Sequence, residues 1–181
     1  MNPTYTSLGD HMESIQVDYD PAVISYARLL EEFRRGHRPF AASWSRQYAS
    51  AIFFHDEEQK KEALAAKQRW EKERHGALKS EIVPLDTFYL AEDYHQKYRL
   101  RKDALFFRAF MRLHPRKTNQ AVMNSTVAAR LNGYLQGHGD LGALSRELTG
   151  LGLTPPEQKQ LWAIVKGNHP SEGVTCPIPE G

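Results

Sequence analysis

Cysteine is almost absent from this sequence, because its 181 residues contain one, Cys176. A single thiol excludes an internal disulfide framework and a zinc site built from several cysteines. No apolar run approaches the ~18–20 residues that cross a bilayer, and the first residues lack the apolar core of a signal peptide. We therefore expect a protein of a reducing, cytoplasmic compartment with no membrane partner.

The chain also lacks a large excess of charge of one sign, because it contains 24 lysines and arginines and 22 aspartates and glutamates. The short basic runs, such as residues 99–102, alternate with acidic residues and are typical of a solvated surface. We expect no nucleic-acid partner. A hydrophobic content of 40% is ordinary for a globular protein, and the length suits one moderate domain or a domain with an appendage.

The first part of the chain alternates between strand and helix patterns. Ile15, Val17 and Tyr19 are separated by polar residues, and this period of two predicts a half-buried strand. A helix is predicted over residues 23–36, with Ser25 as its N-cap.

Two further strands are predicted on either side of a second helix. The nearly continuous apolar run in residues 48–55 predicts a strand in the centre of a sheet. Residues 56–76 open with acids and are rich in alanine, lysine and glutamate, which predicts a helix. A short strand follows at 80–85, and Pro84 marks its end or a sheet edge.

The second part of the chain reads as helices alone. Residues 90–113 form one helical stretch, and three shorter helices follow within 124–139, 141–153 and 155–167. The segment HPRKTNQ is polar and aperiodic, which indicates a boundary. The predicted division is a first domain over 1–113, a linker over 114–124, a helical extension over 125–167 and a flexible tail over 168–181.

Four segments in order resemble the A-type peptide methionine sulfoxide reductases. They are NPTY, GDHMESIQVDYDPAVISYARLLEEF, RQYASAIFFHDEEQKKEA and EIVPLDTFYLAEDYHQKY, within residues 2–100. The resemblance implies an α/β (α+β) two-layer fold with a mixed sheet and a ferredoxin-like core, N-terminally truncated here, followed by a C-terminal helical extension. It implies reduction of the S epimer of methionine sulfoxide, free or in proteins, with thioredoxin or another thiol as reductant and no further cofactor.

The family's nucleophile is a cysteine in a Gly-Cys-Phe-Trp motif ahead of the NPTY segment. This motif does not occur in the 181 residues, so we expect the chain as given to be inactive. Cys176 lies in VTCPIPEG, without a basic neighbour or a helix start that would lower its pKa. This setting favours an incidental thiol over a residual redox role.

The resemblance also assigns residues that hold and protonate the sulfoxide oxygen, and these map to Glu13, Tyr48 and Tyr98. The oxygen carries negative charge and leaves as water, so the reaction needs hydrogen-bond donors and a proton. A carboxylic acid whose pKa is raised by poor solvation can supply that proton while phenols hold the oxygen. Without the resemblance, Glu13 is a solvated loop carboxylate and Tyr48 a half-buried packing residue.

Ser43, Asp93 and His95 are predicted to contact the substrate or to support the site. Ser43 stands where many family members have an aspartate, so it can donate a hydrogen bond but supplies no charge. Asp93 and His95 belong to the segment AEDYHQ, which the resemblance places along the wall of the pocket. There they orient neighbours or cap a helix.

Two other functions remain open. The chain could be a non-catalytic module that binds methionine sulfoxide or a peptide through Glu13 and Tyr48. Alternatively, it could be an interaction protein that acts through its C-terminal helices. Their apolar residues pack either in a core or on another chain: Leu131, Tyr134, Leu135, Leu144, Leu148, Leu161, Trp162 and Val165.

Overall fold

The computed structural model describes residues 11–114 and 118–168. The chain divides into two compact units, Met1–Leu90 and Ala91–Gly181. This division lies ahead of the boundary that the sequence suggests at 114–124, and a helix, α5 (Asn119–Met123), occupies part of that segment. The predicted tail and Cys176 lie outside the described residues, apart from Asn168.

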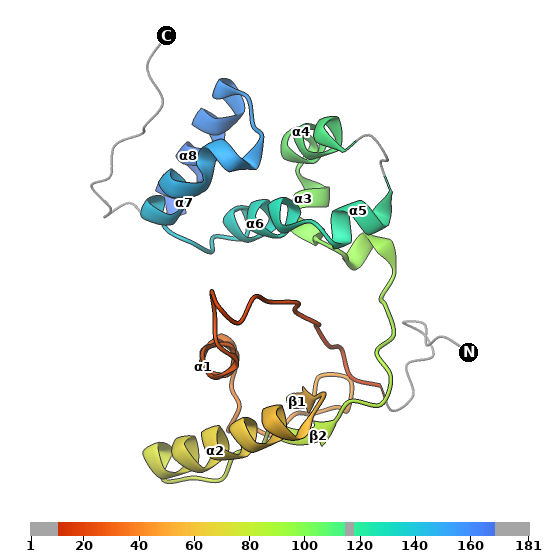
Figure 1. Cartoon of the computed structure of the whole chain (residues 1–181), viewed down its shortest axis with the longest axis vertical. Coiled ribbons are helices and arrows are strands. Elements are labelled where there is room, and N and C mark those ends of the chain that lie inside the picture. Colours follow the sequence, from red (N-terminus) through yellow and green to blue (C-terminus); the bar gives the residue numbers. More distant parts are fainter. Residues whose placement is uncertain (1–10, 115–117, 169–181) are drawn as a thin grey trace. The chain divides into compact units, whose positions relative to one another are not determined.

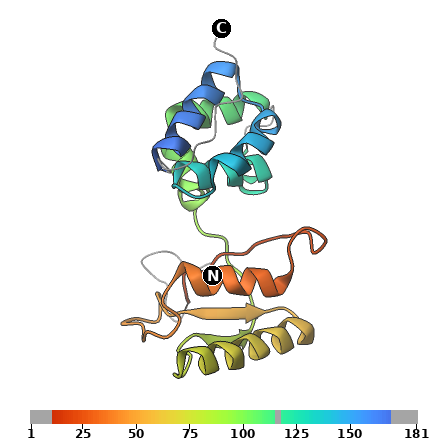
Figure 2. The ribbon, with the colours of Figure 1, turned by 90° about the vertical axis from the view of Figure 1, so that its left-hand side faces the viewer.

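The described residues of the first unit form two strands and two helices, which can be followed in Figures 1 and 2. In chain order they are α1 (Tyr26–Gly36), β1 (Ala51–Phe54), α2 (Glu57–Arg74) and β2 (Glu81–Pro84). The strands are parallel, with Ile52 opposite Ile82, and α2 is the crossover helix that parallel strands need. The combination of helices and strands confirms the predicted mixture of both, although the described sheet is purely parallel.

Local capping determines where both helices of the first unit begin. The Ser25 hydroxyl accepts a hydrogen bond from the Arg28 amide at 3.2 Å, as predicted for an N-cap. The Asp56 carboxylate likewise accepts from the Gln59 amide at 2.8 Å. At the far end of α2, His75 adopts a left-handed conformation with a φ of 50° and terminates the helix just before the glycine at position 76.

The core of the first unit is small. Ala63, Ala66 and Trp70 lie three and four residues apart on α2, so they share the face that packs on the strands and on α1. The small alanines allow α2 to approach the sheet closely, and the indole fills the remaining space. Leu30, Ile52 and Leu78 complete the buried cluster.

The predicted strand at Ile15–Tyr19 is wrong. Residues 11–20 have no regular structure, and the side chains of Ile15 and Val17 are 88% and 53% exposed. A strand needs a neighbour for its backbone groups, and within the described residues β1 pairs with β2 alone. Within the described residues β1 has β2 as its neighbour on one side and no strand on the other. The predicted position of β1 in the centre of a sheet is therefore not observed.

The second unit consists of helices throughout its described residues (Figure 1). The predicted stretch 90–113 is divided, because Lys97 has a φ of 55° and Asp103 caps a new helix with its carboxylate. In addition to α5, the elements are η1 (Asp93–His95), α3 (Tyr98–Lys102), α4 (Ala104–Leu113), α6 (Thr126–Leu135), α7 (Leu141–Glu147), η2 (Leu148–Leu151) and α8 (Pro155–Asn168).

One continuous core joins all parts of the second unit. Leu100 and Phe106, from α3 and α4, are fully buried together with Leu131 from α6 and Leu161 from α8. The apolar set predicted for the C-terminal helices therefore packs in this core, with Leu135 partly buried at its margin. No described helix is both long and apolar enough to cross a membrane.

Candidate functional site

Glu13 is fixed against the segment that follows α1. Its backbone amide donates to the Gln47 carbonyl at 3.0 Å, and the Gln47 side-chain amide donates to Glu13 Oε1 at 2.7 Å. These paired bonds bring two residues that are 34 positions apart into register. Because Tyr48 is the next residue in the chain, Glu13 and Tyr48 come to lie in the same neighbourhood.

The surroundings of Glu13 differ from the expected poorly solvated pocket. The residue is exposed, and within the described part of the chain Oε2 has no hydrogen-bond partner. Gln47 therefore orients the carboxyl group through one oxygen and leaves the other available. A ligand that covers this surface would itself have to exclude the water.

Tyr48 packs against an exposed tryptophan. The centroid of its ring lies 5.1 Å from that of Trp44, with the two planes tilted by 43°. Tyr48 is 43% exposed and Trp44 is 84% exposed. The sequence reasoning missed Trp44, although a tryptophan in a polar loop, SWSRQY, was an available signal.

A shallow pocket of about 430 Å³ lies on the same segment. Ser43, Trp44, Arg46, Lys79 and Glu81 are among its lining residues, whereas Glu13 and Tyr48 are not. The Ser43 hydroxyl donates to the Ser45 carbonyl at 2.8 Å and accepts from the Ser45 amide at 3.3 Å. Ser43 therefore shapes the loop and lines the pocket, which agrees with a place near the substrate but does not test that role.

Hydrogen bonds between distant residues hold this segment on the strands. His37 Nε2 lies 2.6 Å from the Ser50 hydroxyl, which lies 2.5 Å from the Ser80 hydroxyl. Ser50 and Ser80 directly precede β1 and β2, so the chain of contacts ties the end of α1 to the beginnings of both strands. Arg46 also forms an ion pair with Glu81. No local pattern in the sequence signals these contacts.

The AEDYHQ segment forms a turn in the second unit. Asp93 begins η1 and accepts a hydrogen bond from the Asn119 side chain. His95 Nε2 lies 3.8 Å from Glu92 Oε2, and the His95 ring packs against the Tyr94 ring at 4.2 Å. Contacts within the turn and one from Asn119 of α5 therefore organise it, and its contact with substrate stays a prediction.

Tyr98 begins α3 and is 47% exposed, with Lys102 Nζ 5.5 Å from the centre of its ring. It belongs to the second unit, as do Asp93 and His95, whereas Glu13, Ser43 and Tyr48 belong to the first. The structure thus groups the predicted residues into two sets, one on each unit.

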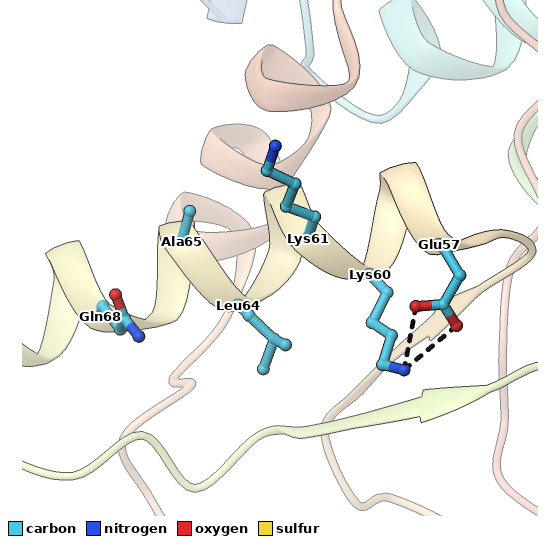
Figure 3. Close-up of a pocket in the computed structure, with 6 residues that line it drawn as sticks. All are labelled: Glu57, Lys60, Lys61, Leu64, Ala65 and Gln68. Carbon is cyan, nitrogen blue, oxygen red and sulfur yellow. Dashed lines mark hydrogen bonds and ion pairs between the residues drawn. The ribbon is translucent and has the colours of Figure 1, made fainter.

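A second hollow, of about 370 Å³, lies on α2 alone (Figure 3). Lys60 Nζ binds both carboxylate oxygens of Glu57 at 3.1 Å, and Leu64 lies beside them with 42% of its surface exposed. An ion pair three residues apart on an exposed helix face is an ordinary solvated surface. None of the predicted site residues lines this hollow.

Metal chemistry finds no support in the described part of the chain, where no group of three or more histidine, cysteine, aspartate or glutamate side chains is arranged to hold an ion. The groups on Glu13 and on the segment that it contacts are the Glu13 carboxyl, the Gln47 amide, the Tyr48 phenol, serine hydroxyls, the Trp44 indole and the Arg46–Glu81 ion pair. Such a set can bind and protonate a polar oxygen, but it contains no thiol.

Comparison with known proteins gives a consistent result. A family model described as peptide methionine sulfoxide reductase matches residues 1–129. The chain is 39% identical over 178 residues to a peptide methionine sulfoxide reductase of Drosophila melanogaster, covering 96% of this chain and 69% of that protein. It is 42% identical over 123 residues to the MsrA of Methanosarcina mazei, covering 60% of this chain and 57% of that one.

A plant relative extends the comparison. The chain is 35% identical over 139 residues to peptide methionine sulfoxide reductase A5 of Arabidopsis thaliana, covering 74% of this chain and 53% of the relative. The matched region thus spans little more than half of the archaeal and plant relatives. Since the family model covers 129 of 181 residues, the chain belongs to the peptide methionine sulfoxide reductase family.

Proposed function

We propose that this chain supplies the oxygen-binding part of a site for methionine-S-sulfoxide. The observation that carries the proposal is the double contact between Glu13 and Gln47, the residue that precedes Tyr48 in the chain. The family resemblance suggests both the reaction and the residues, and the contact between Glu13 and Gln47 supports the choice of Glu13. The substrate is the oxidised methionine side chain, free or within a protein.

The chemistry of the sulfinyl group accounts for the residue types. Its oxygen carries most of the negative charge, so the Tyr48 hydroxyl can donate a hydrogen bond to it. The Ser43 hydroxyl, which donates its proton to the Ser45 carbonyl, would have to turn away from that carbonyl to do the same. Gln47 holds Glu13 Oε1, and we propose that Oε2 delivers a proton to the departing oxygen once the substrate covers this exposed carboxyl group. A proton donor and fixed hydrogen-bond donors at the same oxygen favour the breaking of the S–O bond.

The electrons come from thiols. Reduction of one sulfoxide by two thiols yields the sulfide, one disulfide and one water, which balances atoms and charge. In the family, a cysteine attacks the sulfur, and thioredoxin or a similar dithiol restores it. We propose the same class of reductant here, with the attacking thiol provided by a group other than Cys176.

Asp93, His95 and Tyr98 form the second part of the proposal. The turn that contains Asp93 and His95 is fixed by Asn119, and Tyr98 begins the next helix. In line with the family resemblance, we propose that Tyr98 holds the sulfoxide oxygen and that Asp93 and His95 contact the substrate or orient neighbouring side chains. Their location on a separate unit makes them independent of the Glu13 contact.

A binding module without turnover is the second candidate function. The Glu13–Gln47 contact, which orients a carboxyl group on an exposed surface, serves such a module as well. Both candidates share the oxygen-binding residues and differ only in whether a thiol reaches the sulfur.

A reduction assay tests whether this chain reduces the sulfoxide without a protein thiol from elsewhere. The 181-residue protein and its Cys176→Ser variant are incubated with methionine-S-sulfoxide and dithiothreitol, and methionine is quantified. We expect no turnover above the rate with dithiothreitol alone for either protein. Turnover by the parent that is lost in Cys176→Ser would overturn the assignment of the nucleophile to other residues.

A further inference from the structure

We infer that Ser50 is a nucleophile for acyl transfer, activated by His37, and that the chain hydrolyses small activated esters. The inference goes beyond the proposed function, because it uses neither Glu13 nor a thiol. It begins from one contact: His37 Nε2 lies 2.6 Å from the Ser50 hydroxyl, although the two residues are 13 positions apart. A serine and a histidine within hydrogen-bond distance are the reacting pair of enzymes that form an acyl-serine.

Hydrogen bonding determines which nitrogen of His37 carries the proton. Nδ1 lies 2.5 Å from the backbone carbonyl oxygen of Phe33, which can only accept a hydrogen bond. In the neutral imidazole, Nδ1 is therefore the donor and Nε2 the acceptor. The Ser50 hydroxyl then donates its proton to Nε2. This is the arrangement in which a histidine removes the proton of a serine as a general base.

The imidazole of His37 is also held in position. The ring of Phe33 packs on it with the two centroids 4.1 Å apart, and Phe33 itself packs against the buried cluster of the first unit. The Phe33 carbonyl takes the place of the carboxylate that orients the histidine in many serine hydrolases. A neutral carbonyl stabilises the imidazolium less than a carboxylate does. We therefore expect slow hydrolysis, restricted to esters with good leaving groups.

Ser50 is both polarised and accessible. Ser80 Oγ lies 2.5 Å from Ser50 Oγ, and because the Ser50 proton is directed to His37, Ser80 is the donor of this bond. Ser80 is 5% exposed, whereas Ser50 is half-buried and lines the pocket of about 430 Å³. Ser50 is thus the hydroxyl of the pair that a substrate in the pocket can reach.

The backbone next to Ser50 provides a donor for the oxyanion that forms during acyl transfer. The Ser50 carbonyl accepts from the Glu81 amide at 2.9 Å, so it points toward β2. In a trans peptide the following N–H points in the opposite direction, so the Ala51 amide points away from β2. Within the described residues β1 pairs with β2 alone, and this amide takes no part in that pairing. An N–H of the residue after the nucleophile is a common oxyanion donor.

The reaction consists of two acyl transfers. The Ser50 oxygen attacks the ester carbonyl while its proton passes to His37 Nε2, and that proton then moves to the alcohol oxygen as the C–O bond breaks. Water gives a proton to His37, attacks the acyl-serine, and releases the carboxylic acid and the free Ser50 hydroxyl. Ala41, Ala42 and Ala49 line the pocket, and their small side chains leave room for a short acyl group.

The test is labelling of the 181-residue protein with a fluorophosphonate, which forms a P–O bond with an activated serine and releases fluoride. Mass spectrometry of peptides locates the label. Labelling rates are compared in the parent, Ser50→Ala and His37→Gln, and in two matched controls, Ser14→Ala and His55→Gln. Ser14 and His55 are exposed residues of the same unit, and the Ser14 hydroxyl donates to the Met12 carbonyl.

We expect the label on Ser50 in the parent and no label at that position in Ser50→Ala. The rate should fall about 100-fold in His37→Gln and stay at the parent value in both controls. Hydrolysis of p-nitrophenyl acetate should follow the same order. Thermal unfolding of each variant separates loss of the reacting group from loss of structure.

A further measurement does not depend on how the variants fold. The parent denatured in urea gives the labelling rate of a serine without its histidine, and the native parent should react at least about 100-fold faster. Labelling of Ser50 that is no faster in the native than in the denatured parent would overturn the inference. The parent rate in His37→Gln would overturn it as well, because His37 would then not be the base.

Discussion

The indole N–H of Trp70 donates a hydrogen bond of 2.9 Å to the carboxylate of Glu31, and this bond joins α2 to α1. Arg69 and Arg34 bind the same carboxylate at 2.6 Å and 2.9 Å. The hydrogen bond from Trp70 and then the two arginines lower the pKa of Glu31 from 4.5 to about 2, and partial burial opposes this shift. Glu31 is therefore the main polar link between the helices of the first unit.

The first prediction concerns the pH dependence of this link. Because the pKa of Glu31 is lower in the folded than in the unfolded protein, its carboxylate stabilises the fold. This contribution is complete above about pH 4.5 and is lost as the pH falls toward 2. Glu31→Gln should lower the free energy of unfolding by about 1–2 kcal/mol at pH 7 and by much less near pH 2.5. Urea denaturation at the two pH values measures the difference.

Glu32→Gln is the control for Glu31→Gln. Glu32 lies on the same helix and pairs with Arg28 and Arg35, but its side chain is 48% exposed. Its removal should change stability by less than about 0.5 kcal/mol. A cost for Glu31→Gln that is equal at both pH values would contradict the electrostatic account.

The second prediction compares two glycines of the second unit. Gly139 has a φ of +81°, and an added Cβ would lie 2.7 Å from the ring of Tyr134, which is buried and bound to Glu147 at 2.9 Å. Gly139→Ala should cost about 1–3 kcal/mol, because both the backbone and the ring resist movement. Gly133 lies inside α6 with nothing within 4 Å of such an atom, so Gly133→Ala should stabilise by about 0.5–1 kcal/mol. Denaturation curves in which both substitutions raise, or both lower, the free energy of unfolding would contradict this prediction.

The third prediction is that residues 91–181 fold alone. The core of the second unit includes α3 and α4 as well as the C-terminal helices. A fragment 91–181 should therefore unfold cooperatively, with the blue-shifted emission of a buried Trp162. A fragment 125–181, which follows the boundary suggested by the sequence, lacks Leu100 and Phe106 and should not. Equal cooperativity of the two fragments would show that the shared core is dispensable.

The fourth prediction concerns the AEDYHQ turn. Asn119 binds the Asp93 carboxylate and also accepts from Arg101 at 3.1 Å, so it connects the turn to α3 and α5. Asn119→Ala should increase amide exchange in residues 93–96 and leave the centre of α4 protected. Thr118 caps α5 independently, which preserves that helix. If amide exchange in residues 93–96 is unchanged in Asn119→Ala, the side chains of the turn are sufficient to hold it without Asn119.

Local hydrogen bonding explains which elements could be predicted. The caps at Ser25 and Asp56 depend on residues three positions away, and both helices follow from sequence alone. Asp103 ahead of the apolar run ALFF was an equally local signal for a new helix, and the continuous apolar pattern concealed it. To predict a helix break inside a long amphipathic stretch, capping residues must therefore be considered together with periodicity.

Contacts between distant residues explain what could not be predicted. Ile15 and Val17 have the alternation of a strand, but strand formation depends on a partner that alternation cannot reveal. The Glu13–Gln47 and His37–Ser50 contacts join segments across 34 and 13 positions, and neither has a local signature. Family resemblance identified Glu13 and Tyr48, and geometry alone showed that Gln47 links them.

The most direct test of the oxygen-binding role is the affinity of the 181-residue protein for methionine-S-sulfoxide, measured by calorimetry in the parent and in Glu13→Ala. Loss of a hydrogen bond from a carboxyl group to the sulfinyl oxygen predicts a 10- to 100-fold increase in Kd. Glu32→Ala removes an exposed carboxylate elsewhere and should leave Kd unchanged. Indistinguishable affinities of the parent and Glu13→Ala would contradict the central claim that Glu13 binds the oxygen of the substrate.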